Sequence, residues 1–283
     1  MNRPLRLVAR LAATLMLAAA PVAVASTAPA MASIPAGAVF ALSNEADGNE
    51  VVVLHRDRDG ALTQGPEYPT DGMGSGGGLG SQGALTLTDD GRYLLAVNAG
   101  SDDITAFWVR GSFLVRLNTV QSGGDMPVSV TEHRGVVYAV NAGSTPTIGG
   151  FTLNRHGLSP LPGSTQALAG AGPAQISFTP NGDHLVVTDK PRNMIHTFAV
   201  DRRGHAATPV SSPSVGMTPF GFDIDRRGHL GVSEAFGGAA GASTTSSYAV
   251  GPDGSVDAIS GRSGPGKRRP AECPSPTTGA THT

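Results

Sequence analysis

The sequence predicts an all-β fold built from repeated four-stranded antiparallel units, and three observations lead to that prediction. Glycine accounts for 39 of 283 residues and charged residues for 15%, which suits a chain with many tight turns. Two interleaved series of turn glycines recur at nearly constant spacing. The segments between them are rich in β-branched residues, and no window after the first 32 residues has the apolar period of a helix.

The internal repeat is clearest in residues 84–98 (ALTLTDDGRYLLAVN) and 175–189 (QISFTPNGDHLVVTD). Each holds an apolar strand, a turn with glycine, and a second apolar strand that ends in Asn or Asp. Degenerate copies run from Val128 to Asn141 and from Phe220 to Glu234. The turn glycines of the four copies lie 44, 47 and 46 residues apart, at Gly91, Gly135, Gly182 and Gly228.

A second series of turn glycines interleaves with the first: Gly60, Gly111, Gly157, Gly204 and Gly254. Glycine supplies the positive φ that tight hairpins require. Two hairpins in every repeat of about 45 residues give four strands, called a to d here from the axis outward, which is the plan of a β-propeller blade. A β-sandwich is the alternative, but it does not predict a regular four-strand period. Residues 33–261 should hold about five blades in an open arc, the first beginning at its b strand.

The first 32 residues are predicted to be a secretory signal peptide. Arg3, Arg6 and Arg10 precede a short apolar run, and small residues at Ala25 and Ala32 mark two cleavage points. A membrane anchor is disfavoured because Pro21 interrupts a run already shorter than the ~20 residues of a span. The mature protein is therefore expected to be secreted or extracytoplasmic, without a stable membrane span.

The net charge excludes one class of partner, and the cysteine content indicates how the fold is stabilised. Residues 33–261 contain 13 Lys and Arg against 21 Asp and Glu, a net charge of about −8. Phosphate backbones would repel such a body, so nucleic acid is not expected as a partner. The single cysteine, Cys273, excludes an internal disulfide, so packing must hold the fold.

The blade pattern carries a family resemblance. The Asp-Asp-Gly-Arg turn at residues 89–92, Ala-Val-Asn at 96–98 and Phe-Ala-Val-Asp at 198–201 resemble the lactonase-type seven-bladed propellers. That family includes bacterial 6-phosphogluconolactonase and the fungal carboxymuconate lactonising enzyme (a cyclase). The resemblance covers Gly37 to Gly261. The segments 219–222 (PFGF) and 233–238 (SEAFGG) resemble its exported branch. It implies seven blades and activity on a small lactone.

Propeller geometry sorts the candidate site residues. The a–b and c–d turns lie on one face, and the b–c and d–a connections lie on the other, where ligands usually enter the channel. The residues expected on that channel face as ligand-binding groups are Gln82, Asn98, Ser129, Asn141 and Phe220. His133, His156, His184, His205 and His229 fall at the turns of the opposite face, and His196 lies within a c strand. The family's enzymes use histidine in the pocket, so this chain departs from them.

Lactone hydrolysis needs a base that activates water and a donor for the developing oxyanion. Glu234 or Asp189 is predicted as the base, with Lys190, Arg192 or Gln175 as donors. No motif requires a cofactor. Oxygen side chains at strand-b ends are the candidate ligands of a Ca²⁺ ion: Asn44, Asn98, Asp189 and Glu234. The alternative is that each side chain caps its own turn.

The glycine-rich stretch 72–83 resembles a phosphate loop only superficially, since it follows no parallel strand and precedes no helix. It is predicted to be a mobile surface loop or a loop at the channel rim. Its alternative role is anion binding by backbone amides.

Two functions remain open: an exported lactonase-like enzyme for a small anionic lactone, and a non-catalytic extracytoplasmic propeller that binds a ligand or a protein. The blade pattern ends before residues 262–283, which are predicted to be an irregular tail. Written in G/C-rich codons, the turn at 89–93 read one base late gives Thr-Thr-Gly-Ala-Thr, the string at 277–281. The tail is therefore hypothesised to be a frameshifted sixth blade, and the chain truncated, with Cys273 and residues 267–269 (KRR) carrying no function.

Overall fold

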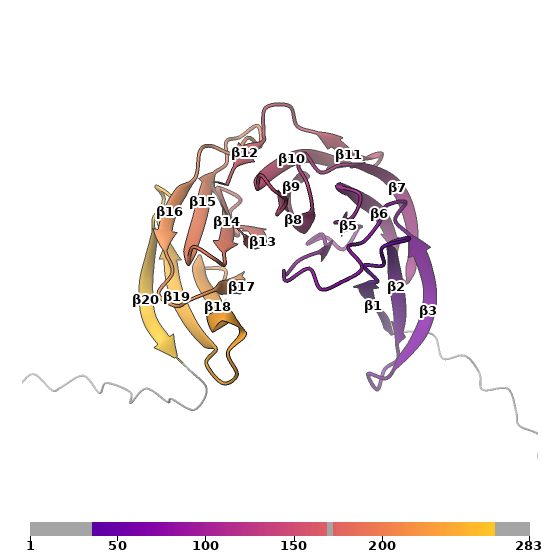
Figure 1. Ribbon diagram of the computed structural model, residues 1–283. Helices are drawn as coiled ribbons and strands as arrows, with labels where there is room; N and C mark the ends of the chain where they lie inside the picture. The colour runs from indigo at the N-terminus through magenta and orange to yellow at the C-terminus, as the bar shows by residue number, and fades with distance from the viewer. Residues whose placement is uncertain (1–35, 169–171, 264–283) are drawn as a thin grey trace, which may run out of the picture. The chain divides into compact units, whose positions relative to one another are not determined.

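In the computed structural model the described residues, 36–168 and 172–263, form five antiparallel β-sheets in chain order (Figure 1). The predicted signal peptide and the predicted tail beyond Ser263 lie outside the described residues. Apart from the strands, these described ranges contain one 3₁₀ turn, η1 (Phe236–Gly238).

The first two sheets contain seven strands. The first sheet consists of β1 (Gly37–Leu42), β2 (Glu50–Arg56) and β3 (Leu62–Pro69). The second consists of β4 (Leu85–Leu87), β5 (Tyr93–Asn98), β6 (Asp103–Arg110) and β7 (Phe113–Gln121).

The remaining sheets repeat the four-strand plan. The third consists of β8 (Pro127–His133), β9 (Val136–Asn141), β10 (Thr147–Asn154) and β11 (Gly157–Pro160), with β12 (Gln166–Ala167) also paired to β10. The fourth consists of β13 (Pro173–Phe178), β14 (His184–Asp189), β15 (Met194–Ala199) and β16 (Val210–Pro213). The fifth consists of β17 (Pro219–Ile224), β18 (His229–Glu234), β19 (Thr244–Val250) and β20 (Val256–Ser263).

The strand order within each sheet follows the chain, so each four-stranded sheet is a blade with strands a to d. The first sheet has three strands that correspond to b, c and d, as predicted. Both series of turn glycines have positive φ, from 65° at Gly111 to 103° at Gly157. Because L side chains rarely adopt this conformation, glycine fixes the hairpins and with them the repeat.

Packing between sheets explains the apolar strands. β14 is buried along its whole length because it lies between two neighbouring sheets. Leu185 and Val187 pack in a cluster with Tyr138 and Val140 of the third sheet, whereas Val186 packs with Val232 of the fifth. Successive side chains of a strand point to opposite faces, so a strand buried on both faces has consecutive apolar residues, here residues 185–187.

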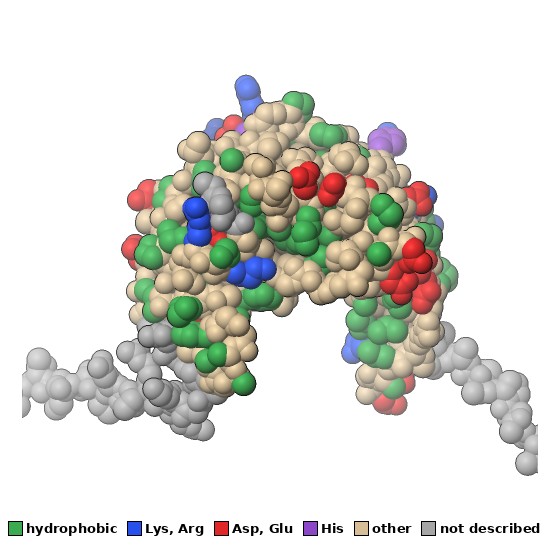
Figure 2. Space-filling view, viewed as in Figure 1, with side chains coloured by type: hydrophobic (Ala, Val, Ile, Leu, Met, Phe, Trp, Pro, Cys, Tyr) green, Lys and Arg blue, Asp and Glu red, His purple; other side chains and the backbone are tan. Residues whose placement is uncertain are grey.

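The inner strands β4, β8, β13 and β17 contact one another in that order, and the sheets follow an open arc (Figure 1). This confirms the prediction of about five blades that do not close into a ring. On the face drawn in Figure 2, acidic side chains gather in several places, while the basic side chains are fewer and lie apart.

Candidate functional site

The b–c and d–a connections meet on one face, as predicted, and one type of contact recurs there. Asp102, in a b–c turn, accepts a hydrogen bond from the backbone N–H of Met126 in the following d–a connection (2.7 Å). Asn193 accepts one from Thr218 in the same way (2.7 Å). The four residues have φ between 56° and 62°, so side-chain contacts hold a backbone that is unfavourable for these residue types. We call this side the channel face.

Residues 71–83, here called the strap, cross the channel face. The strap is tied first to the first sheet: the Gly74 N–H donates to the Glu45 carbonyl (2.7 Å) and the Gly76 N–H to the Asn44 carbonyl (2.9 Å). The Asn44 side chain accepts from the Ser75 N–H (3.0 Å) and donates to the Gly77 carbonyl. Asn44, a predicted metal ligand, therefore holds the strap.

The strap then reaches three more sheets. The Met73 N–H donates to the Ser101 hydroxyl (2.8 Å) of the second sheet, and the Gly83 carbonyl accepts from Val130 (2.8 Å) of the third. The Gln82 N–H donates to the Ala174 carbonyl (2.9 Å) of the fourth. The glycine-rich stretch is therefore a rim of the channel face that is bonded to four sheets.

Lys190 is half-buried beside the strap, where its Nζ donates to the Gly80 carbonyl and lies 5.5 Å from the centroid of the Phe220 ring. Burial lowers the pKa of Lys190 below the usual lysine value, and the charge of the adjacent Asp189 partly opposes this effect. The predicted donor Lys190, the predicted ligand-binding residue Phe220 and the strap thus come together.

A cleft of about 420 Å³ is bounded by Gln82 of the strap and by Gly221, the residue that follows Phe220. Its floor is held by Gln175, whose side chain donates to the Phe222 carbonyl and accepts from the Phe222 N–H (both 2.9 Å), joining the a strands of the fourth and fifth sheets. The lining residues are Gln82, Gly83, Gln175, Gly221, Phe222, Asp223, Gly231, Ser233 and Thr245. Gln82 and Gln175 were predicted from the sequence, whereas Asp223 and Ser233 were not.

The polar residues at the ends of the b strands are fully buried and bond within the blades. Asn98 donates to Asp103 and Thr105 (2.5 and 2.9 Å), and burial raises the pKa of Asp103. Asn141 donates to Thr147 (3.2 Å). Asn98 also accepts from Asn49 next to the first sheet (2.8 Å). These two predicted ligand-binding residues therefore make structural hydrogen bonds.

Asp189 and Glu234, the predicted bases, are also fully buried. One Asp189 oxygen accepts from the Gly172 N–H (3.0 Å), and the other lies 3.3 Å from Nε2 of His196. Glu234 accepts from the hydroxyls of Thr244 and Tyr248. Neither carboxylate lines the cleft. The predicted ligand-binding residue Ser129 is buried as well and accepts from the Ile176 N–H (3.2 Å).

Replacing Glu234 by alanine should lower the free energy of unfolding by about 1–3 kcal/mol, because the hydroxyls of buried Tyr248 and half-buried Thr244 lose this acceptor. Urea denaturation of the variant and of the parent protein measures this difference. Thr245→Ala, one residue away on β19, is the matched control and should stay close to the parent protein. Unchanged stability in Glu234→Ala would contradict the structural role.

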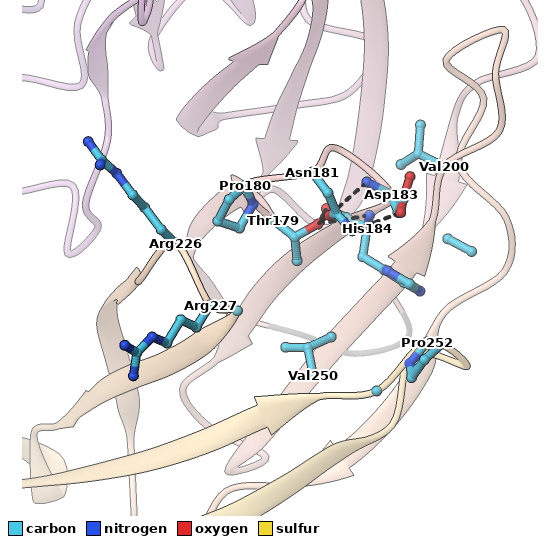
Figure 3. A pocket seen from close by; sticks show the side chains of 13 residues that line it. Thr179, Pro180, Asn181, Asp183, His184, Val200, Arg226, Arg227, Val250 and Pro252 are labelled. Carbon is cyan, nitrogen blue, oxygen red and sulfur yellow. Dashed lines mark hydrogen bonds between the residues drawn. The ribbon is translucent and has the colours of Figure 1, made fainter.

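The five turn histidines lie by the hairpins of the opposite face, as predicted, and one of them lines a larger cleft of about 560 Å³ between the fourth and fifth sheets (Figure 3). His184 is buried there, and its Nε2 has no hydrogen-bond partner among the described residues. Arg226 and Arg227 also line the cleft, but their guanidinium groups extend away from His184 (Figure 3).

No functional role was predicted for His196, the histidine expected within a c strand. It is buried on strand c, with Nδ1 2.8 Å from the Ser211 hydroxyl and Nε2 facing Asp189. The pairing of Asp189 with Met194 places His196 two residues further along β15, on the same face of the sheet. Pairing the predicted b and c strands would have revealed this neighbour.

The leading part of the propeller matches a known protein family. Residues 31–156 match the family model described as "Lactonase, 7-bladed beta-propeller". This part of the propeller is similar to the lactonase type. The matched residues hold the leading part of the propeller and include the strap, which ties the first four sheets together. No curated protein sequence matches the chain.

Solved structures show the same fold at low identity. A candidate 6-phosphogluconolactonase from Bacteroides fragilis is 17% identical, with a TM-score of 0.60 over 80% of this chain and 69% of that one. A Lactobacillus plantarum protein is 19% identical, with a TM-score of 0.58 over 75% of this chain and 64% of that one. The periplasmic gluconolactonase of Pseudomonas aeruginosa is 15% identical, with a TM-score of 0.53 over 83% and 71%. This chain therefore spans about two thirds of the length of the first two.

Within the described ranges, no helix is long and apolar enough to cross a membrane.

Proposed function

We propose that this lactonase-type propeller is an exported enzyme that hydrolyses a small anionic lactone in the channel-face cleft. The observation that carries the proposal is the position of Lys190, a partly desolvated cation at the strap beside a cleft lined by amide, hydroxyl and carboxylate side chains. The family match and the gluconolactonase among similar structures support the choice of a lactone.

The chemistry assigns a role to each group. Lys190 is suited to bind the anionic group of the ligand, because a half-buried ammonium pairs with an anion more strongly than an exposed one. Gln82 supplies a side-chain amide donor to the ring oxygens or to the developing oxyanion. The Ser233 hydroxyl donates to the Gly221 carbonyl (2.8 Å) and can accept from a hydroxyl of the ligand. Asp223 lines the cleft and is exposed, so the base that activates water is assigned to Asp223 in place of the buried Asp189 and Glu234.

The predicted Ca²⁺ ligands do not fit a shared site well. Asn44 holds the strap, the Asn98 oxygen accepts from Asn49 next to the first sheet, and Asp189 and Glu234 use their oxygens within their blades. In the described part of the chain, no three His, Cys, Asp or Glu side chains group in a way that could hold a metal ion. Ca²⁺ dependence stays a prediction, and no step is assigned to the ion.

The test is a hydrolysis screen of purified protein over neutral and anionic sugar lactones, with Ca²⁺ or with a chelator. We expect anionic lactones to be hydrolysed faster than neutral ones, and Asp223→Asn to lower kcat by about 10²–10⁴-fold, the usual contribution of a general base. Asp257→Asn, on the outer strand β20, is the control. Equal rates for the Asp223→Asn variant and the parent protein would overturn the assignment of Asp223 as the base. If no lactone were hydrolysed, the proposed lactonase function would be overturned.

A non-catalytic binding propeller is the second candidate, because the hairpin-face cleft contains a buried histidine nitrogen without a partner and two exposed arginines (Figure 3). A ligand that binds without turnover, and whose affinity falls in His184→Ala but not in Lys190→Met, would favour this function over the lactonase.

Export is proposed from the leader sequence alone. Mass spectrometry of the secreted protein should find a new N-terminus at Ser33 or Ser26. Intact Met1 on a cytoplasmic product would contradict it.

A further inference from the structure

Three side chains of the fourth sheet form a continuous hydrogen-bonded array across the blade. Asp189 at the end of β14 is fully buried, and its Oδ2 lies 3.3 Å from Nε2 of His196 on β15. Nδ1 of the same ring lies 2.8 Å from Oγ of Ser211 on β16. His196 is 6% exposed, whereas Ser211 is exposed on the outer strand. The array therefore leads from a buried carboxylate to a solvent-accessible hydroxyl.

The second sheet contains a corresponding array, in which an asparagine and two threonines stand where the fourth sheet has a carboxylate, an imidazole and a serine. Asn98, Thr105 and Thr119 occupy the corresponding positions of strands b, c and d, since Thr105 pairs with Thr119 as His196 pairs with Ser211. Asn98 donates to Thr105 (2.9 Å), and the two threonine hydroxyls lie 3.0 Å apart. Bracing a blade therefore does not need an imidazole.

The hydrogen-bond roles follow from the chemistry of the three groups. A carboxylate can only accept, so Asp189 in its ionised form holds the neutral imidazole in the tautomer with its proton on Nε2. Nδ1 is then an acceptor, and the Ser211 hydroxyl donates to it. This is the relation of nucleophile, base and orienting carboxylate by which serine hydrolases activate a hydroxyl.

We propose that Ser211 is an activated nucleophile and that the outer rim of the fourth blade carries a second, esterase-type site. Oγ attacks the carbonyl of an ester, its proton passes to Nδ1 of His196, and the leaving alcohol takes that proton. Water then hydrolyses the acyl-serine with His196 as the base, which restores all three groups. The reaction needs no cofactor and is independent of the channel-face cleft.

The setting of Ser211 indicates the substrate class. β16 is the terminal strand of its sheet, so it has a ladder partner on one side and presents alternate N–H groups outward. Backbone N–H groups of this kind can stabilise an oxyanion. Ser211 is exposed on this strand, so an ester at the protein surface can reach it. The substrate class is therefore small or terminally exposed acyl esters.

The test is covalent labelling of the purified protein with an alkyl fluorophosphonate, followed by peptide mass spectrometry. Attack of Oγ on phosphorus expels fluoride and leaves a phosphonylated serine. We expect one label, on Ser211. The label should be absent in Ser211→Ala and form at least a hundredfold more slowly in His196→Gln. Thr119 and the neighbouring Ser212 are internal controls that should stay unlabelled.

Two results would overturn the proposal: no label on Ser211 in the parent protein, or labelling of His196→Gln at the parental rate with its melting temperature unchanged. A purely structural array would give a lower melting temperature in His196→Gln and no label on Ser211. Lactone hydrolysis in Ser211→Ala should match that of the parent protein, because Ser211 lies outside the channel-face cleft. The mapped label on the parent protein decides the question even where His196→Gln fails to fold.

Discussion

Replacing Lys190 by methionine should weaken the binding of an anionic ligand to the channel-face cleft by roughly tenfold or more. A hydrogen bond to a charged group contributes about 1.5–3 kcal/mol, and 1.4 kcal/mol is a tenfold change in affinity. Methionine keeps the length and much of the apolar stem, so contact with Phe220 should persist while the ammonium is lost. Isothermal titration with gluconate as the probe measures the effect.

Arg155→Met is the matched control for this substitution. It removes one positive charge from an exposed hairpin of the third blade, on the face opposite the channel. Its affinity for gluconate should equal that of the parent protein. A similar loss in both variants would mean that net charge, and not Lys190, governs binding.

The same lysine predicts a pH dependence. Burial disfavours the ammonium, so the pKa of Lys190 lies below the usual lysine value. The protonated form of Lys190 binds the anion. Affinity should therefore be highest at pH values below the lowered pKa of Lys190 and should fall as the pH rises through it. Lys190→Met should lose this alkaline decrease.

The blades could be predicted because their determinants are local. Each hairpin depends on one glycine with positive φ, such as Gly91 or Gly182, and two hairpins per repeat fix the number of strands. The continuous apolar run of β14 reflects burial on both faces, which only a stack of sheets provides. The periodicity of the sequence was therefore sufficient to predict the number and arrangement of strands in each blade.

The candidate site was less predictable because it depends on what the last side chain of each b strand contacts. Asn98, Asp189 and Glu234 share the position and the oxygen chemistry that suggested a channel-facing ring. Each instead meets a hydroxyl or imidazole on its neighbouring c strand, since a buried polar group needs a partner. The partners lie seven to ten residues away, and only the strand register identifies them.

The prediction of a loop at the channel rim is confirmed, but the contacts of the strap could not be predicted, for a related reason. Its composition, with seven glycines between residues 72 and 83, is typical of flexible linkers. Yet Gly74 and Gly100 approach other backbone segments so closely that no side chain would fit. Glycine here permits contact between backbones, which composition cannot distinguish from flexibility.

Substituting alanine for Gly74 should therefore displace the strap and disable the channel-face cleft. A Cβ atom at Gly74 would overlap the backbone of Asn44, and backbone cannot move aside as a side chain can. Overpacking of this kind costs about 1–3 kcal/mol of stability. The strap positions the Gly80 carbonyl against Lys190, and a misplacement of about 1 Å can cost a hundredfold in rate.

Gly78→Ala provides the control within the same segment. A Cβ atom at Gly78 would meet nothing within 4 Å, and its φ lies outside the left-handed region, so alanine is compatible with the backbone. Urea denaturation should show a loss only in Gly74→Ala. kcat/KM for the best lactone of the screen should fall by roughly a hundredfold in Gly74→Ala and stay within about twofold in Gly78→Ala. Equal activity in the two variants would mean that the strap does not position the site, because only Gly74→Ala places a Cβ atom against the backbone of Asn44.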